Sequence, residues 1–199
     1  MKKLILIRHG ETDYTIKNKF CGHEDIPLNK DGILQAALLK TKLESLNIEK
    51  VYSSDLKRAM QTAEILFSNK RIVKRKGLRE IDFGKLSGYT HEQVNKLHPE
   101  LFKEWLNHPE CMKVPGGENI KGFTRRVLKT FSGISLRNKR NVVAIVSHGG
   151  PIRAILVSLL GLDAKMFWRI EQGVTALNVI TFNKGIARVI KINDTAHLK

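Results

Sequence analysis

A run of four aliphatic residues, Leu4 to Ile7, stops directly at Arg8, His9 and Gly10. A short aliphatic run that breaks into polar residues and glycine is typical of a central strand buried on both faces of a sheet. Parallel strands buried in this way belong to α/β proteins, because helices must cover both faces. The first ten residues therefore predict an α/β chain, with Arg8 and His9 at the carboxyl end of a buried strand.

Strand-like and helix-like segments alternate along the next part of the chain. The pattern predicts helices over residues 33–46 and 55–67 and strands over residues 48–53 and 71–74. In the first helix, Leu34, Ala37, Leu38 and Leu46 would form the buried face. In the second, Asp55 would act as the N-cap. The order is βαβαβ.

The second half of the chain continues this alternation after a helical insertion. Residues 91–107 are helical in character but interrupted by Pro99, which ends one helix and allows another to start. Pro115-Gly116-Gly117 marks a turn, and Asn183-Lys184-Gly185 marks a hairpin. The remaining expected elements are a helix over 118–137, a strand over 142–146, a helix opened by Pro151, and strands over 175–182 and 187–192. We expect an α/β sandwich in which residues 1–199 form a single domain.

Charge and composition narrow the partners of this chain. With 35 basic and 19 acidic residues, the net charge of +16 attracts anions such as phosphate-bearing substrates. Nucleic acid would also be attracted, but the basic residues are dispersed and aromatic residues make up only 7%, so we expect no nucleic-acid binding. The sequence lacks a membrane-spanning run and a signal peptide, which predicts a cytoplasmic location and no membrane partner. Cys21 and Cys111 have neither metal-ligand nor disulfide spacing.

Four short motifs occur in a fixed order along most of the chain. They are Arg8-His9-Gly10-Glu11-Thr12, the segment Ser53 to Ala63 (SSDLKRAMQTA), Leu78-Arg79-Glu80, and Ser147-His148-Gly149-Gly150. Together they resemble the motifs of the histidine phosphatase (phosphoglycerate mutase-like) superfamily. Any one of them alone would fit a structural role, but four in family order are a specific signal. Pattern and resemblance together predict a three-layer α/β/α sandwich with a mostly parallel sheet and a small helical insertion.

The residue types in these motifs suit phosphoryl transfer. A neutral imidazole is a competent nucleophile, so His9 is the candidate for a phosphohistidine intermediate. Guanidinium groups match the charge and geometry of phosphate oxygens, which makes Arg8 and Arg58 the candidate clamp. Such a site would work without a metal or a cofactor.

The remaining catalytic candidates come from the later motifs. Glu80 stands at the position of the family's general acid, which must protonate the leaving oxygen. His148 precedes an expected helix start, so its side chain and the N–H of Gly149 could bind the same phosphate oxygens. Residues 81–88 (IDFGKLSG) lack the tyrosine and the arginine-rich stretch of cofactor-dependent mutases and resemble the phosphatase branch.

The loop after the nucleophile bears on the substrate. Cys21-Gly22-His23, followed by Pro27-Leu28, resembles α-ribazole phosphatases, and we expect His23 to contact a large, base-like leaving group. Thr15 stands where many members have a phosphate-binding asparagine, and its hydroxyl could donate instead. Cys21 replaces a better hydrogen-bond donor, so phosphate binding in this loop would rely on backbone N–H groups such as that of Gly22.

The sequence thus predicts a hydrolase of a small phosphorylated metabolite, with α-ribazole 5′-phosphate as the first substrate to test. Phosphoserine phosphatase and broad-specificity phosphatase activity are the alternatives within the enzyme class. Phosphoglycerate mutase activity is less favoured because residues 81–88 resemble the phosphatase branch. Intact His9, Glu80 and His148 argue against a non-catalytic phosphate-binding role. The sequence is also compatible with a homodimer.

Overall fold

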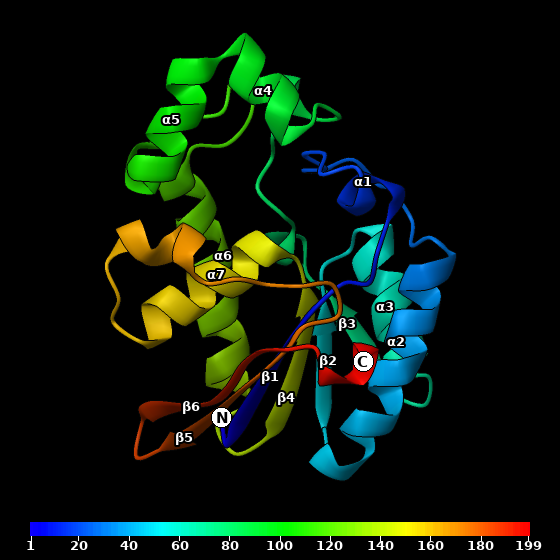
Figure 1. Cartoon of the computed structure of the whole chain (residues 1–199). Helices are drawn as coiled ribbons and strands as arrows, with labels where there is room; N and C mark the ends of the chain where they lie inside the picture. Colours follow the sequence, from blue (N-terminus) through cyan, green and yellow to red (C-terminus); the bar gives the residue numbers. More distant parts are fainter.

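A six-stranded sheet forms the centre of the molecule, with the strand order β3-β2-β4-β1-β5-β6. The computed structural model describes residues 1–199 (Figure 1). The strands are β1 Lys3–Arg8, β2 Lys50–Ser53, β3 Ile72–Lys74, β4 Val142–Ser147, β5 Leu177–Asn183 and β6 Ile186–Asp194. Each strand predicted from the sequence is present, with ends shifted by one or two residues.

The sheet is mostly parallel, as predicted. β1 pairs in parallel with β4, β4 with β2, and β2 with β3, whereas β5 runs antiparallel to β1 and β6 antiparallel to β5. Lys184 and Gly185 join β5 to β6, and both have a positive φ. This geometry is that of the tight hairpin turn whose twist matches the flanking strands.

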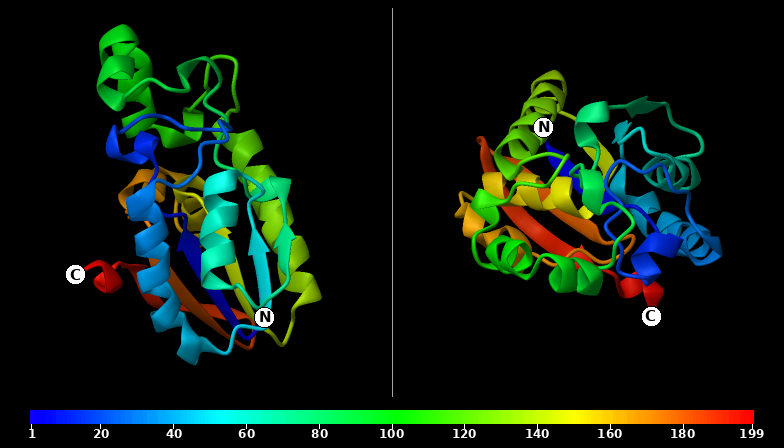
Figure 2. Two further views of the ribbon diagram at one scale, coloured as in Figure 1. Left: turned by 90° about the vertical axis from the view of Figure 1, so that its right-hand side faces the viewer. Right: turned by 90° about the horizontal axis from the view of Figure 1, so that it is seen from above.

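Helices cover both faces of the sheet and complete the predicted three-layer sandwich. α2 (Lys30–Leu43) and α3 (Lys57–Leu66) pack on one face, and α6 (Ile120–Arg137) and α7 (Gly149–Leu159) on the other. The view from the side shows α2 and α3 in front of the strands (Figure 2). Six 3₁₀ helices lie between these elements: η1 Glu44–Leu46, η2 Lys76–Leu78, η3 Gly84–Leu86, η4 Pro109–Cys111, η5 Ala164–Arg169 and η6 Ala196–Leu198.

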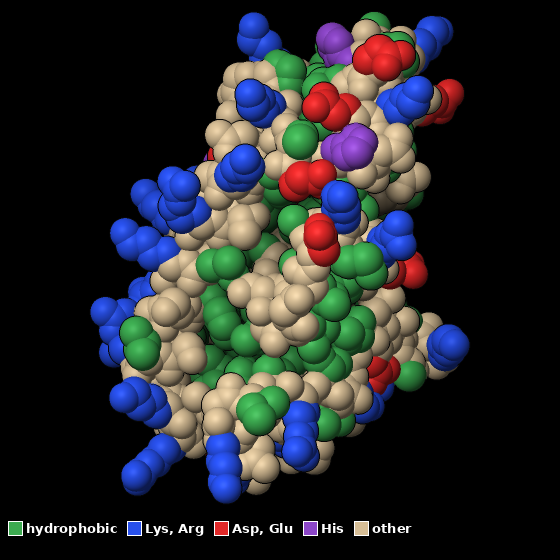
Figure 3. Space-filling model, turned by 90° about the vertical axis from the view of Figure 1, so that its left-hand side faces the viewer, with side chains coloured by type: hydrophobic (Ala, Val, Ile, Leu, Met, Phe, Trp, Pro, Cys, Tyr) green, Lys and Arg blue, Asp and Glu red, His purple; other side chains and the backbone are tan.

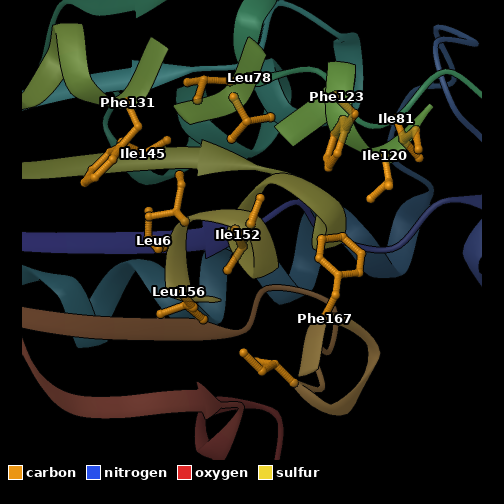
Figure 4. Close-up of a cluster of buried hydrophobic side chains, with 14 of the residues drawn as sticks. Leu6, Leu78, Ile81, Ile120, Phe123, Phe131, Ile145, Ile152, Leu156 and Phe167 are labelled. Carbon is orange, nitrogen blue, oxygen red and sulfur yellow. The ribbon is translucent and has the colours of Figure 1, made fainter. Parts of the chain in front are cut away.

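Alternate residues of β1 are buried in two different cores. Leu4 and Leu6 belong to the larger cluster under α6 and α7, and Ile5 and Ile7 to the smaller cluster under α2 and α3; all four are fully buried. Figure 4 shows Leu6 among side chains from β4, α6, α7 and η5. Burial on both faces explains why the strand reads as an uninterrupted aliphatic run.

The helical insertion lies above the carboxyl ends of the parallel strands (Figure 1). It contains α4 (His91–Leu97) and α5 (Pro99–Asn107), and the short helix α1 (Asp13–Ile16) lies at the same end. Pro99 is the first residue of α5, as predicted, because proline there removes an N–H that has no partner inside the helix. Trp105 of α5 is buried and anchors the insertion to the larger core. None of the helices has the length and apolar character needed to span a bilayer.

Two local predictions are wrong. Leu34 and Leu38 of α2 are 58% and 46% exposed, and Ala37 is exposed as well. Ala36, Leu39 and Leu43 face the core instead, and Leu46 lies beyond α2 in η1, partly buried against the smaller core. Apolar residues occur on several sides of this helix, so their spacing did not define one face. Asp55 does not cap α3, which begins at Lys57 after Leu56; its carboxylate accepts two hydrogen bonds of 2.7 Å from Arg79.

Basic side chains are dispersed over the surface. On the face formed by α6, α7 and the β5–β6 hairpin, lysine and arginine side chains surround a hollow with an apolar floor, and acidic side chains gather mainly toward the helical insertion (Figure 3). No continuous basic groove dominates this face. On this face, the dispersed positive charge contributes to a long-range field that attracts anions.

Candidate active site

His9 lies immediately after β1, at the carboxyl end of the parallel strands, and is only 4% exposed. Its Nδ1 lies 2.7 Å from the carbonyl oxygen of Gly10. A carbonyl can only accept a hydrogen bond, so Nδ1 carries the proton and Nε2 keeps its lone pair. Burial, together with the charges of Arg58 and Arg8, holds the pKa of His9 well below 6.5. The fold thus keeps this imidazole neutral, in the tautomer that a nucleophile needs.

Arg58 links α3 to the loop that follows the nucleophile. Its Nη1 donates to the carbonyl of Glu24 at 2.7 Å, its Nη2 to the carbonyl of Gly22 at 2.8 Å, and its Nε to Nδ1 of His148 at 3.2 Å. The side chain is 1% exposed, and burial lowers its pKa. A guanidinium group held on three sides is fixed before any ligand arrives, as an electrostatic clamp requires.

Arg8 supplies a second cation beside the nucleophile. Its Nη1 donates to the carbonyl of Gln172 at 2.5 Å, while its buried Nε has no partner in the protein. Burial lowers the pKa of Arg8 to about 10, and the neighbouring charges of Arg153 and Arg58 add to this effect. A buried donor without an acceptor costs free energy in the unliganded protein, so Arg8 is placed to bind an anion.

His148 is fully buried at the carboxyl end of β4, and its ring centroid is 5.1 Å from that of His9. Because Arg58 can only donate, Nδ1 of His148 must accept, which leaves the proton on Nε2. Nε2 then donates to Oγ of Ser54 at 2.9 Å. Burial and the charge of Arg58 hold the pKa of His148 well below 6.5. Both ring nitrogens are thus engaged by the protein, so the predicted phosphate contact would require the Ser54 bond to be exchanged.

Glu80 reaches the first turn of α7. Its Oε2 accepts from the backbone N–H of Gly150 at 3.1 Å, and its Oε1 from that of Ile81 at 3.0 Å. Any Cβ at Gly150 would overlap Oε1, so only glycine permits this approach. Gly149, the first residue of α7, has a backbone N–H with no acceptor inside the helix. The structure brings Glu80, Gly149, Arg8, His9 and Arg58 together around one pocket.

Several loop residues predicted to bind phosphate are engaged in contacts within the protein. Thr15 lines the pocket, but its hydroxyl donates to the carbonyl of Thr12 in a capping box of α1, so its proton is already used. The carbonyl of Gly22 accepts a hydrogen bond from Arg58. The contact of the Gly22 N–H with phosphate stays a prediction. Burial raises the pKa of Cys21 to about 11, which keeps it a thiol.

His23 is not among the residues that line the pocket. Its Nε2 donates to the backbone carbonyl of Glu80 at 2.9 Å, and its Nδ1 lies 3.7 Å from a carboxylate oxygen of Asp82. The expected contact with a base-like ring is therefore not made by this side chain in its present position. It supports the backbone that carries Glu80.

The pocket has a volume of about 380 Å³ and contains residues that the sequence did not single out. Arg153, Lys19 and Trp168 line it beside the predicted residues. Arg153 could have been found, since it follows Gly149 by four residues on the expected helix and so lies on the same face. Trp168 belongs to η5, which gave no periodic signal. No group of three or more His, Cys, Asp or Glu side chains is arranged to hold a metal ion.

A buried neutral histidine among guanidinium groups at the carboxyl edge of an α/β sheet defines a phosphate-handling site. The chain belongs to the Histidine phosphatase superfamily (branch 1), whose family model matches residues 4–195. It is therefore a phosphatase of that superfamily, as its motifs predicted.

Relatives with different named activities match nearly the whole chain. Phosphoserine phosphatase 1 of Hydrogenobacter thermophilus is 34% identical over 100% of this chain and 95% of its own length. The adenosylcobalamin/alpha-ribazole phosphatase of Escherichia coli is 29% identical over 98% of this chain and 97% of its own length. Among solved structures, the His9→Ala mutant of phosphoserine phosphatase from Entamoeba histolytica, in complex with phosphoserine, has a TM-score of 0.91 at 30% identity, with complete coverage of both chains.

Proposed function

We propose that this protein hydrolyses small phosphate monoesters through a phosphohistidine formed on Nε2 of His9. The observation that carries this proposal is the tautomer of His9: its hydrogen bond to Gly10 leaves Nε2 as the free lone pair of a buried, neutral ring. Arg8 and Arg58 supply the positive charge that the three equatorial phosphoryl oxygens require. We further propose that no metal is needed, because these two groups provide the charge neutralisation that a metal would supply.

In the first step, Nε2 of His9 attacks phosphorus, the P–N bond forms and the ester P–O bond breaks. Glu80 gives its proton to the leaving oxygen, which departs as an alcohol. In the second step, water attacks phosphorus, Glu80 accepts the proton of the water, and the P–N bond breaks to release inorganic phosphate and neutral His9. Gly149 donates its free N–H to a phosphoryl oxygen throughout. His148 orients Arg58, and its own contact with phosphate stays a prediction.

Two leaving groups have support from different observations. α-Ribazole 5′-phosphate is supported by the Escherichia coli relative and by the aromatic side chains Phe20, Phe83 and Trp168, which line the pocket and could stack on a base. Phosphoserine is supported by the relative with 34% identity and by the small size of the pocket. Since His23 binds the Glu80 backbone and does not line the pocket, its side chain gives no support to the larger substrate. A panel of esters ranked by kcat/KM would decide between them and would also reveal broad specificity.

The phosphohistidine is tested by trapping it. Wild-type protein mixed with a ³²P-labelled ester in the presence of EDTA should yield a phosphoprotein that is labile in acid and stable in alkali. His9→Ala should neither label nor release phosphate, whereas His98→Ala, which changes an exposed histidine, should behave as wild type. Equal labelling of His9→Ala and wild type would remove His9 from this role, and binding without turnover by the wild type would indicate a phosphate-binding protein.

A further inference from the structure

Arg153 places a third guanidinium group in the active-site pocket. It extends from α7, its Nε donates to the carbonyl of Ile170 at 2.7 Å, and its Cζ lies 5.5 Å from the centroid of the Trp168 ring. These contacts fix the plane of the group from one side. Nη1 and Nη2 make no hydrogen bond or ion pair with the protein, so the fork of N–H donors is free to bind a ligand.

The charge of the pocket exceeds what a phosphoryl group requires. Its lining includes four cationic side chains and one carboxylate, that of Glu80. A phosphate monoester carries about two negative charges at neutral pH, and Arg8 and Arg58 are sufficient to balance them. Arg153 and Lys19 therefore leave positive charge in the pocket beyond that of the phosphate clamp. A second anionic group on the substrate would balance it.

Arg153 also lies on the leaving-group side of the reaction centre. The acid must reach the ester oxygen, so the leaving group lies beside Glu80. A Cβ built on Gly149 would be 2.8 Å from Nη1 of Arg153 and 4.0 Å from Oε2 of Glu80, so the guanidinium group and the acid both border the space beside Gly149. A carboxylate two or three bonds from the ester oxygen could thus reach Arg153 while Glu80 holds that oxygen.

We propose that Arg153 determines specificity by binding a carboxylate of the leaving group, so that the preferred substrates are phosphate esters of small carboxylic acids. This inference rests on the proposed function of the same site. A guanidinium fork and a carboxylate form two parallel charge-assisted hydrogen bonds, and the Trp168 ring keeps water from one face of the pair. No carboxylate other than Glu80 lines the pocket, so an amino group on the substrate has no dedicated partner. The recognised group is the carboxylate.

Two pairs of substrates isolate this carboxylate. 3-Phosphoglycerate and glycerol 3-phosphate differ only by a carboxylate in place of a hydroxymethyl group, and phosphoserine and phosphoethanolamine differ only by a carboxylate in place of hydrogen. In each pair, we expect the wild type to have a kcat/KM at least tenfold higher for the acid. Arg153→Gln should lower that ratio by about ten- to a hundredfold, the value of a buried charged hydrogen bond, mainly through KM. Arg153→Lys keeps the charge but lacks the fork of N–H donors, so its kcat/KM ratio should lie between those of the wild type and Arg153→Gln.

The controls separate this inference from the proposed function. Arg137→Gln removes an exposed arginine near the end of α6 and should leave both ratios unchanged. If wild type hydrolyses p-nitrophenyl phosphate but shows no preference within either pair, the inference is wrong and the proposed function stands. If Arg153→Gln slows both members of a pair equally, Arg153 belongs to the phosphate clamp and the inference is also wrong. Failure of the wild type to hydrolyse any ester would refute the proposed function itself.

Discussion

A single methyl group at position 150 should displace the general acid. In Gly150→Ala, the new Cβ would overlap Oε1 of Glu80 and lie 3.1 Å from Cζ of Phe123, so the carboxyl group must move toward the pocket. To reach ordinary van der Waals distance, Oε1 of Glu80 has to shift by more than about 1 Å, and a misplacement of about 1 Å can already lower a catalytic rate by about a hundredfold. The shift also breaks the 3.1 Å hydrogen bond from the N–H of Gly150.

The expected loss depends on the leaving group. Alkyl phosphates need a proton from Glu80, so kcat for such an ester should fall by about a hundredfold. p-Nitrophenolate leaves without a proton, so p-nitrophenyl phosphate should lose much less. Steady-state kinetics with the two esters measures this contrast, and thermal unfolding by circular dichroism shows whether the variant is folded.

The matched control is Gly133→Ala on α6, where a Cβ meets nothing within 4 Å. It should leave both rates unchanged and stabilise the helix by up to about 1 kcal/mol. An equal loss with both esters in a folded Gly150→Ala variant would show that Glu80 only shapes the pocket. Unchanged rates would show that its position does not matter for turnover.

Three further predictions follow from the described contacts. The pKa values of His9 and His148 are held well below 6.5 in the folded protein, so the unfolded chain binds protons that the folded chain does not as pH falls toward 6.5 and below. The free energy of unfolding measured in urea should therefore be highest above about pH 7.5 and drop by about 2 to 3 kcal/mol by pH 5.5, and His148→Gln should reduce that drop. A urea midpoint of unfolding that does not change with pH would contradict this prediction. His23→Ala removes one of the two donors to the Glu80 carbonyl and leaves Nη2 of Arg126, so kcat should fall by up to about tenfold for every ester tested; a loss confined to α-ribazole phosphate would show instead that the ring contacts substrate. With a pKa of about 11, Cys21 should resist iodoacetamide at pH 8 while exposed Cys111 reacts, as mass spectrometry of the modified peptides would show; faster labelling of Cys21 would refute the burial argument.

The elements that the sequence predicted well are those with an unambiguous local signal. The aliphatic run Leu4 to Ile7 had no polar residue to compete with burial, and Lys184-Gly185 supplied the positive φ values that the hairpin turn needs. In contrast, α2 carries apolar residues on several faces, and only the position of the sheet decides that Leu39 is buried and Leu38 exposed. Tertiary packing makes that choice, and no local pattern contains it.

The site shows the same division. His9, Arg58 and Glu80 could be found because they lie in motifs, and the strand that precedes His9 already places it at the sheet edge. The partners of these residues could not be found, because they are set by contacts between distant segments, such as His23 with the carbonyl of Glu80 or Arg79 with Asp55. A loop histidine such as His23 has the same local sequence whether it faces a ligand or the backbone, so the sequence alone does not distinguish the two.

The hydrogen bonds from Arg58 to the loop after the nucleophile reach only main-chain atoms of that loop. Both of its bonds to that loop end on carbonyl oxygens, those of Gly22 and Glu24, and these atoms are the same whichever side chains the loop carries. Mutations can therefore change the side chains that the loop presents to a leaving group without breaking the hydrogen bonds that hold Arg58 in place. A catalytic framework of this kind can diversify in substrate while its reaction stays constant, and loops exchanged between relatives should retain phosphoryl transfer wherever the backbone path at positions 22 to 24 is kept.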